Sequence, residues 1–294
     1  MTSVLLLGFG AIGRHVAQLL SPELAAGTLS LTALVSDRAK HDGRPNHGAE
    51  VVDLPGLARL AGRADIDTSP SPRMFDGFDV IVECAGVPAA AQLGPSAIAS
   101  GRPLVLTSVG ALAAPEARAG LLAGPGRLYV TNGAIGGLDV LEAAAQADGL
   151  DSVEITTSKE AGGLIRPWVS ETEAARLRDL RPEDGPLTVF TGNPAEAIEK
   201  FPANVNIAVA LAWATRGLSA GTSDADMLGA SLERVQVVIQ AVAGQNQSAH
   251  RIRAAGSAGG FTFDIRSTPS PENPATSGLT ALSVTRTLRS VIAG

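Results

Sequence analysis

The stretch that decides the fold is Val-Leu-Leu-Leu-Gly-Phe-Gly-Ala-Ile-Gly, residues 4–13. The apolar run Val4–Leu7 is typical of a strand buried in a parallel sheet. A G-x-G-x-x-G spacing follows it and opens a helical stretch whose apolar residues recur on one face. Strand, glycine turn and helix in this order predict a dinucleotide-binding βαβ unit. The residues expected to hold the cofactor there are Gly8, Gly10, Ala11, Ile12 and Gly13.

Each glycine has a physical reason in such a turn. The first permits the tight bend, the second lets the pyrophosphate approach the backbone, and the third lets helix and strand pack closely. The helix N–H groups and dipole then bind the pyrophosphate. The motif alone is weak evidence for dinucleotide binding, because ordinary tight turns also use glycine. The strand before it and the helix after it strengthen this evidence.

The first half of the chain repeats this alternation. Further apolar runs of strand length are separated by helix-length segments, which predicts a Rossmann-type, doubly wound parallel sheet in an α/β domain. These runs are Leu29–Val35, Val80–Val82, Leu104–Leu106 and Leu128–Val130.

After about Leu150 the pattern changes to apolar-polar alternation, which predicts a second α+β domain with a mixed or antiparallel sheet. The alternating runs are Ser152–Ser158, Arg234–Ile239, His250–Ala254 and Phe261–Ile265. We expect a helix from near Pro202 and a loop or helix connector over Gly217–Gly229. A last helix over Ala275–Ile292 would open at Asn273-Pro274. The predicted domains are 1–140 and 141–274, followed by the helical segment 275–294.

Composition excludes several classes of protein. The 294 residues carry 23 Lys and Arg against 29 Asp and Glu, a net charge of −6, which argues against nucleic-acid or anionic-membrane partners. The longest apolar run, Ile207–Ala214, is too short to cross a bilayer, and no signal peptide is evident. The single cysteine, Cys84, excludes an intramolecular disulfide and a Cys-based zinc cluster. We therefore expect a cytoplasmic protein.

Asp37 ends the second predicted strand, where an acidic side chain accepts hydrogen bonds from the adenosine ribose and favours NAD. A solvated turn residue is the alternative interpretation. Ser36 or Arg38 could instead tolerate a 2′-phosphate, so NAD is favoured and NADP stays open.

Small residues follow the later strands, where ligands bind in such sheets. Cys84, Ala85 and Ser108 are candidates for contact with a flat nicotinamide ring, and ordinary β–α turns are the alternative. Cys84 is better explained as a small apolar residue than as a nucleophile.

Five further blocks, spaced along the chain in order, resemble the L-aspartate dehydrogenase family together with the glycine motif, from Val4 to about Leu288. They are Glu83–Ala85, Ser108–Leu112, Gly133–Gly137, Phe201–Asn206 and Asn273–Ser277. The resemblance implies oxidative deamination of L-aspartate to iminoaspartate with NAD or NADP. Iminoaspartate either feeds NAD biosynthesis or hydrolyses to oxaloacetate and ammonia. The resemblance also implies a homodimer through the second domain's sheet and a last helix packed on the first domain.

Three site residues follow from the resemblance alone. Ala134 would contact the cofactor through its backbone, and Asn206 would hydrogen-bond its nicotinamide side. His250 corresponds to the catalytic histidine, just ahead of the strand 251–254. Asn204 would lie about 200° from Asn206 on a helix, which suits a cap. The family pattern is altered in Val242–Ala249 and in the long 217–229 segment.

Amine oxidation needs a base, and histidine can serve at neutral pH. His15, His41 and His47 are expected at the surface or in packing, and nothing supports a metal pair from the last two. A dicarboxylate substrate needs a cationic clamp. Lys159 is the preferred clamp, although a solvated edge lysine is the alternative, and Arg166 could substitute.

Two alternatives stay open at this point. One is a related oxidoreductase, homoserine-dehydrogenase-like or dihydrodipicolinate-reductase-like, that acts on another amino acid or imine. The other is a non-catalytic nucleotide-binding protein that kept the fold.

Overall fold

The computed structural model describes residues 1–60, 70–201, 206–245, 247–270 and 272–294. The chain forms two compact units, Met1–Gly133 with Thr280–Gly294, and Ala134–Leu279. We call them unit 1 and unit 2. Within the described ranges, no helix is both long and apolar enough to span a membrane.

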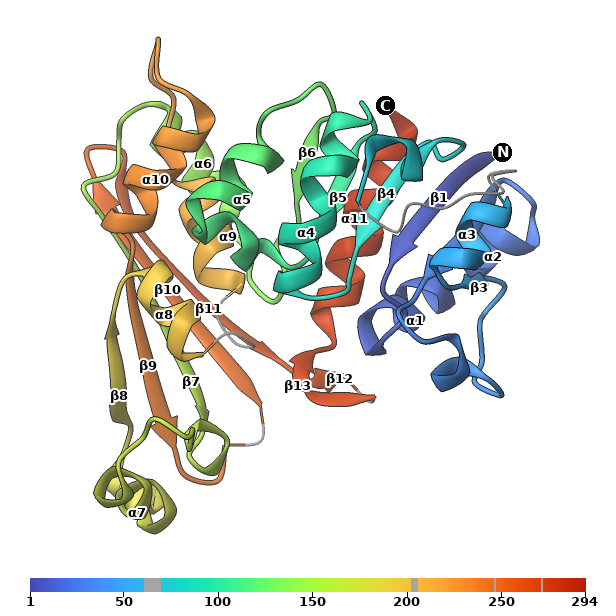
Figure 1. Ribbon diagram of the computed structural model, residues 1–294. Helices are drawn as coiled ribbons and strands as arrows, with labels where there is room; N and C mark the ends of the chain where they lie inside the picture. The colour runs from blue at the N-terminus through green and yellow to red at the C-terminus, as the bar shows by residue number, and fades with distance from the viewer. Residues whose placement is uncertain (61–69, 202–205, 246, 271) are drawn as a thin grey trace. The chain divides into compact units, whose positions relative to one another are not determined.

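Unit 1 contains a parallel sheet of six strands in the order β3-β2-β1-β4-β5-β6 (Figure 1). The strands are β1 (Thr2–Leu7), β2 (Leu29–Leu34), β3 (Glu50–Val52), β4 (Val80–Glu83), β5 (Leu104–Leu106) and β6 (Leu128–Val130). The doubly wound parallel sheet is therefore confirmed, with its order reversing between β1 and β4. The sequence missed β3, because three residues ending in Val51-Val52 are too short to show a strand period.

Helices and 3₁₀ turns connect these strands. They are α1 (Ala11–Leu19), α2 (Ser21–Ala25), η1 (Arg38–His41), α3 (Leu54–Leu60), η2 (Pro72–Phe75), α4 (Val87–Ala99), η3 (Val109–Ala113) and α5 (Pro115–Leu121). The last helix, α11 (Leu279–Ala293), joins this unit's core, where Val284 and Leu288 are fully buried in one cluster with Val4 and Leu6.

The helix expected from Ala275 begins four residues later. Residues Asn273–Ser277 form strand β13, which pairs antiparallel with β12 (Pro269–Ser270). The N–H of Gly278 donates to the carbonyl of Thr268 at 2.9 Å and ends this hairpin just before α11. Proline at a first helical turn is a preference, and strand pairing overrides it here.

Unit 2 contains a mixed sheet in the order β11-β10-β7-β9-β8. Its strands are β7 (Ser152–Glu160), β8 (Leu187–Gly192), β9 (Gln236–Val242), β10 (Ser248–Gly256) and β11 (Gly259–Ser267). Only the β7–β9 pair is parallel. The mixed sheet is confirmed, while β8 was missed because its burial alternates only weakly.

The helices and 3₁₀ turns of unit 2 are α6 (Leu138–Gln146), η4 (Gly162–Leu164), α7 (Glu171–Asp179), η5 (Pro182–Asp184), α8 (Pro194–Lys200), α9 (Asn206–Ala214) and α10 (Asp224–Arg234). Helix α10 begins inside the segment expected to be a loop or connector. Ser223 caps it, since its hydroxyl accepts from the N–H of Asp226 at 3.2 Å. The helix start expected near Pro202 lies outside the described residues.

Candidate active site

The glycine turn of unit 1 meets the three demands of a pyrophosphate site. Gly8 has φ +90°, and a Cβ there would lie 2.7 Å from the Cα of Ala85. A Cβ on Gly13 would collide with the carbonyl oxygen of Gly8, so helix and strand pack at the closest approach. A Cβ on Gly10 would meet nothing within 4 Å, and no side chain caps the helix it precedes. The turn therefore fits a dinucleotide whose pyrophosphate lies over Gly10 at the N-terminus of α1.

A buried carboxylate ties the loops after β4 and β5 together. Glu83 is 0% exposed. Its Oε1 accepts from the N–H groups of Ala85 at 2.7 Å and Gly86 at 2.9 Å, and from the Ser108 hydroxyl at 2.9 Å. Its Oε2 accepts from the N–H of Ser108 at 2.8 Å. Two predicted cofactor residues, Ala85 and Ser108, are thus positioned by one side chain.

Cys84 is held as a neutral thiol. Its Sγ lies 3.5 Å from the hydroxyl of Thr107. Burial raises the pKa of the thiol, and the nearby charge of Glu83 raises it further. A thiol that does not ionise is a poor nucleophile, which favours the small apolar role.

Asp37 caps the 3₁₀ turn η1 at the end of β2. Its Oδ1 accepts from the N–H of Ala39 at 3.1 Å, and Lys40 Nζ lies 3.5 Å from its Oδ2. Both oxygens therefore already have local partners, and Arg38 is next in the chain. Asp37 could bind a ribose hydroxyl through its carboxylate, and the cations beside it could bind a 2′-phosphate.

His250 of unit 2 lies inside strand β10, as its third residue, whereas the sequence placed it just ahead of a strand. Its side chain is buried, with 4% exposure. Its Nδ1 lies 3.1 Å from the hydroxyl of Thr157, which is opposite it on β7. The imidazole is thus held on one nitrogen by a buried hydroxyl.

Lys159 lies two residues beyond Thr157 on the same strand, and strand alternation puts both side chains on the same face. Burial and the charge of Arg166 lower the pKa of Lys159 to about 8. Burial and the charge of Lys159 lower the pKa of His250 to about 4. At neutral pH the pair is therefore a neutral imidazole beside a protonated amine that deprotonates easily.

The other predicted residues of unit 2 are placed as follows. Asn206 is the first residue of α9 and is half-buried. Ala134 is buried and follows β6 by four residues. Asn204 lies outside the described residues. Contact of Ala134 and Asn206 with a cofactor stays a prediction.

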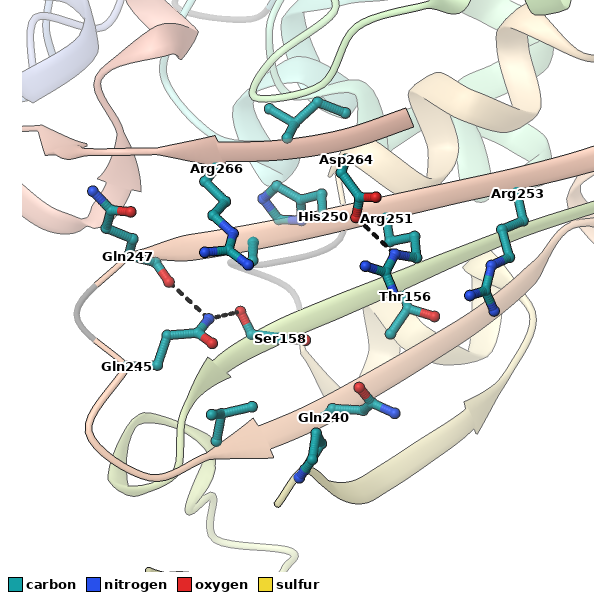
Figure 2. Close-up of a pocket in the computed structure, with 14 residues that line it drawn as sticks. Thr156, Ser158, Gln240, Gln245, Gln247, His250, Arg251, Arg253, Asp264 and Arg266 are labelled. Carbon is teal, nitrogen blue, oxygen red and sulfur yellow. Dashed lines mark hydrogen bonds and ion pairs between the residues drawn. The ribbon is translucent and has the colours of Figure 1, made fainter. Parts of the chain in front are cut away.

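A cavity of about 430 Å³ opens on the opposite face of the unit 2 sheet (Figure 2). Arg251 and Arg253 point into it from β10, together with Asp264 from β11 and Gln240 from β9. His250 borders it, but strand alternation turns its imidazole to the buried face with Ile252. This cavity therefore does not collect the predicted catalytic groups.

The other histidines of the described chain do not cluster. His15 is on α1, His47 has φ +52°, and His41 packs its ring 6.0 Å from that of Phe9. No group of three or more His, Cys, Asp or Glu side chains arranged to bind a metal occurs in the ranges that the structure covers.

Two residues escaped the sequence reasoning. Glu83 could have been identified, because it is a glutamate at the end of an otherwise apolar strand. A carboxylate buried at such a position requires several hydrogen-bond donors. Thr157 carries no comparable signal, because only the pairing of β7 with β10 brings it to His250.

Comparisons with known proteins bear on both units of the chain. The aspartate dehydrogenase C-terminal family model matches residues 139–291, just over half of the chain, and the homoserine dehydrogenase NAD-binding domain model matches 8–124. An L-aspartate dehydrogenase of Ralstonia nicotianae is 33% identical over 98% of this chain and 97% of its own. One from Ruegeria pomeroyi is 36% identical over 97% of this chain and 91% of its own.

Among solved structures, the aspartate dehydrogenase of Thermotoga maritima has the same fold. Its TM-score is 0.67 at 24% identity, and the match covers 99% of this chain and 97% of that one. Full-length similarity to curated relatives and the match of the C-terminal model show that this chain belongs to the L-aspartate dehydrogenase family.

Proposed function

We propose that the protein is an NAD(P)-dependent L-aspartate dehydrogenase that forms iminoaspartate, with His250 as the acid-base residue. The observation that carries this proposal is the buried His250–Thr157 pair beside Lys159 in a member of this family. In the reaction, the Cα–H bond of aspartate breaks and its hydride leaves. The ammonium group loses a proton as the C=N bond forms.

The glycine turn of unit 1 would hold the cofactor, as its fit to a pyrophosphate indicates. When bound, the oxidised nicotinamide ring accepts the hydride. Ala85 and Ser108 would border that end of the cofactor, because ligands lie outside the carboxyl ends of β4 and β5.

His250 can accept the substrate's proton because its imidazole is neutral at physiological pH. Thr157 holds Nδ1, which leaves Nε2 for the reacting group. If the Thr157 hydroxyl accepts from Nδ1–H, Nε2 carries the lone pair that a base needs. The same nitrogen can later activate the water that converts the imine to oxaloacetate and ammonia.

Lys159 would bind a carboxylate of the substrate. With a pKa of about 8 it is protonated at neutral pH, and an anion beside it would raise that pKa again. Arg166 is the alternative cation, since its charge already acts on Lys159.

The direct test measures reduced cofactor formed from L-aspartate, and its consumption with oxaloacetate plus ammonia. We expect His250→Ala to lower kcat by roughly 10²–10⁴-fold. His47→Asn is a matched control, because it removes an imidazole from unit 1 at a position whose positive φ asparagine tolerates. Absence of turnover in both directions contradicts the substrate assignment.

The mechanism also requires that His250 and the cofactor reach the same substrate carbon. A ternary crystal structure with dinucleotide and a dicarboxylate tests this. A nicotinamide ring far from the imidazole would exclude the acid-base role. A substrate panel separates aspartate from another amino acid or imine, and tight dinucleotide binding without turnover would select a non-catalytic protein.

We further propose a cytoplasmic homodimer joined through the exposed face of the unit 2 sheet, whose product serves NAD biosynthesis. The support is family membership. Arg251 there pairs with Asp264 at 2.6 Å, and Arg253 and Arg266 line the same cavity. Sedimentation of Arg253→Glu against wild type tests the interface, since the substitution would shift the equilibrium toward monomer. An unchanged dimer contradicts this placement.

A further inference from the structure

Glu83 is a buried carboxylate that the proposed chemistry does not use. Its two oxygens accept four hydrogen bonds, three from backbone N–H groups and one from the Ser108 hydroxyl. An N–H group can only donate, so each of these contacts needs a lone pair on the carboxylate. The arrangement is therefore built for the ionised form, although burial opposes it.

No cation compensates this charge within the described part of unit 1. None of the ion pairs there involves Glu83. The titratable neighbour in contact range is Cys84, whose thiol stays neutral. A buried charge without a partner is costly, and four donors offset only part of the lost hydration. An incoming cation would therefore be attracted to this place.

The topology indicates which cation that is. The strand order reverses between β1 and β4, and a dinucleotide binds across this point. Its adenosine would lie toward β2 and its pyrophosphate over the glycine turn. Its nicotinamide would consequently extend over the carboxyl ends of β4 and β5. These two strands are neighbours in the sheet (Figure 1), and Glu83 ties their loops together. The oxidised nicotinamide ring carries a positive charge, and the reduced ring is neutral.

We propose that Glu83 is a selectivity residue for the redox state of the cofactor, which makes unit 1 bind the oxidised dinucleotide in preference to the reduced one. The negative charge of Glu83 attracts the cationic ring that binds over the loops held together by this carboxylate. Reduction neutralises the ring, so attraction falls when the reduced product must leave. This inference rests on the proposed NAD(P) use but needs neither His250 nor aspartate.

The experiment measures three dissociation constants for the full chain: NAD⁺ and ADP-ribose by calorimetry, and NADH by fluorescence. ADP-ribose lacks the nicotinamide and reports on the rest of the crevice. We compare wild type with Glu83→Gln and with Glu116→Gln, which removes the same charge from the exposed start of α5. We expect Glu83→Gln to lower the ratio Kd(NADH)/Kd(NAD⁺) roughly three- to tenfold. Glu116→Gln should leave the ratio unchanged.

Equal weakening of NAD⁺ and NADH by Glu83→Gln would overturn the proposal, because it would show a loop-holding role alone. If this variant does not fold, the wild-type pH dependence decides. Burial raises the pKa of Glu83, so the preference for NAD⁺ should be full above that pKa and fall as pH drops through it. The proposal is overturned if the ratio Kd(NADH)/Kd(NAD⁺) does not change with pH. The Kd of ADP-ribose at each pH reports on the rest of the crevice. Failure to bind either dinucleotide overturns the cofactor assignment itself, whereas inactivity with aspartate alone leaves this inference standing.

Discussion

Two buried ionisable sites, one in each unit, are built in opposite ways. Glu83 in unit 1 has four hydrogen-bond donors around one carboxylate. His250 in unit 2 has one hydroxyl partner, and a nearby like charge from Lys159. A group whose hydrogen bonds are satisfied fixes the shape of a site. An imidazole held through one nitrogen keeps the other nitrogen for a reacting group, which proton transfer requires. The contrast is consistent with the roles proposed above, in which Glu83 organises and charges the cofactor end of unit 1 and His250 transfers a proton.

The largest effect should come from removing the carboxylate. Glu83→Ala leaves four donors without an acceptor and frees the two loops. We expect a loss of about 3–5 kcal/mol in the free energy of unfolding, measured by urea denaturation. Ser108→Ala removes one donor and should cost only about 1 kcal/mol. Equal losses in the two variants would show that Glu83 does not act as the shared acceptor.

Thr157→Val tests whether the hydroxyl orients the imidazole. The substitution keeps the shape of the side chain and removes the partner of Nδ1. We expect kcat to fall roughly 10- to 100-fold with little change in KM, and the acid limb of the pH profile to shift. Thr157→Ser should restore most of the activity. An active Thr157→Val enzyme with an unaltered pH profile would leave His250 oriented by something else.

Lys159→Met should change binding and stability in opposite directions. Without the cation, KM for aspartate rises, and at neutral pH the buried charge no longer costs free energy. We expect a stability gain of about 1–2 kcal/mol at pH 7. The folded-state pKa of about 8 lies below the ordinary lysine pKa of 10.5, so the gain should be full below pH 8 and vanish as pH rises to 10.5. Thermal unfolding at several pH values measures this gain. A Lys159→Met variant that is less stable than wild type at pH 7 would show that the buried ammonium does not destabilise the fold.

The smallest effect concerns the adenosine end of unit 1. Asp37→Ser removes an acceptor for the ribose and leaves Lys40 without its partner. We expect the ratio of kcat/KM for NAD to that for NADP to fall about tenfold. A ratio unaffected by the change would mean that Asp37 serves only as the cap of η1.

The sequence predicted the features that local pattern determines. Residues 4–13 predicted strand, turn and helix correctly, because Gly8 and Gly13 answer local steric demands. The pattern missed β3, which has three residues, and misplaced the start of α11, where pairing with β12 outweighs the signal of Pro274. Thr157 could not be found at all, since its relation to His250 depends on strand register between segments 93 residues apart.

The position of α11 has a consequence for biosynthesis. Val284 and Leu288 fill the core around the first strand, and Arg289 pairs with Glu23 at 2.6 Å. A ribosome delivers residues 1–133 long before these partners. The nucleotide-binding half must therefore wait as an incomplete nascent chain, open to chaperones, until residues 280–294 leave the exit tunnel. A premature stop codon there would leave the core of unit 1 unfilled although the whole parallel sheet and the glycine turn had been translated.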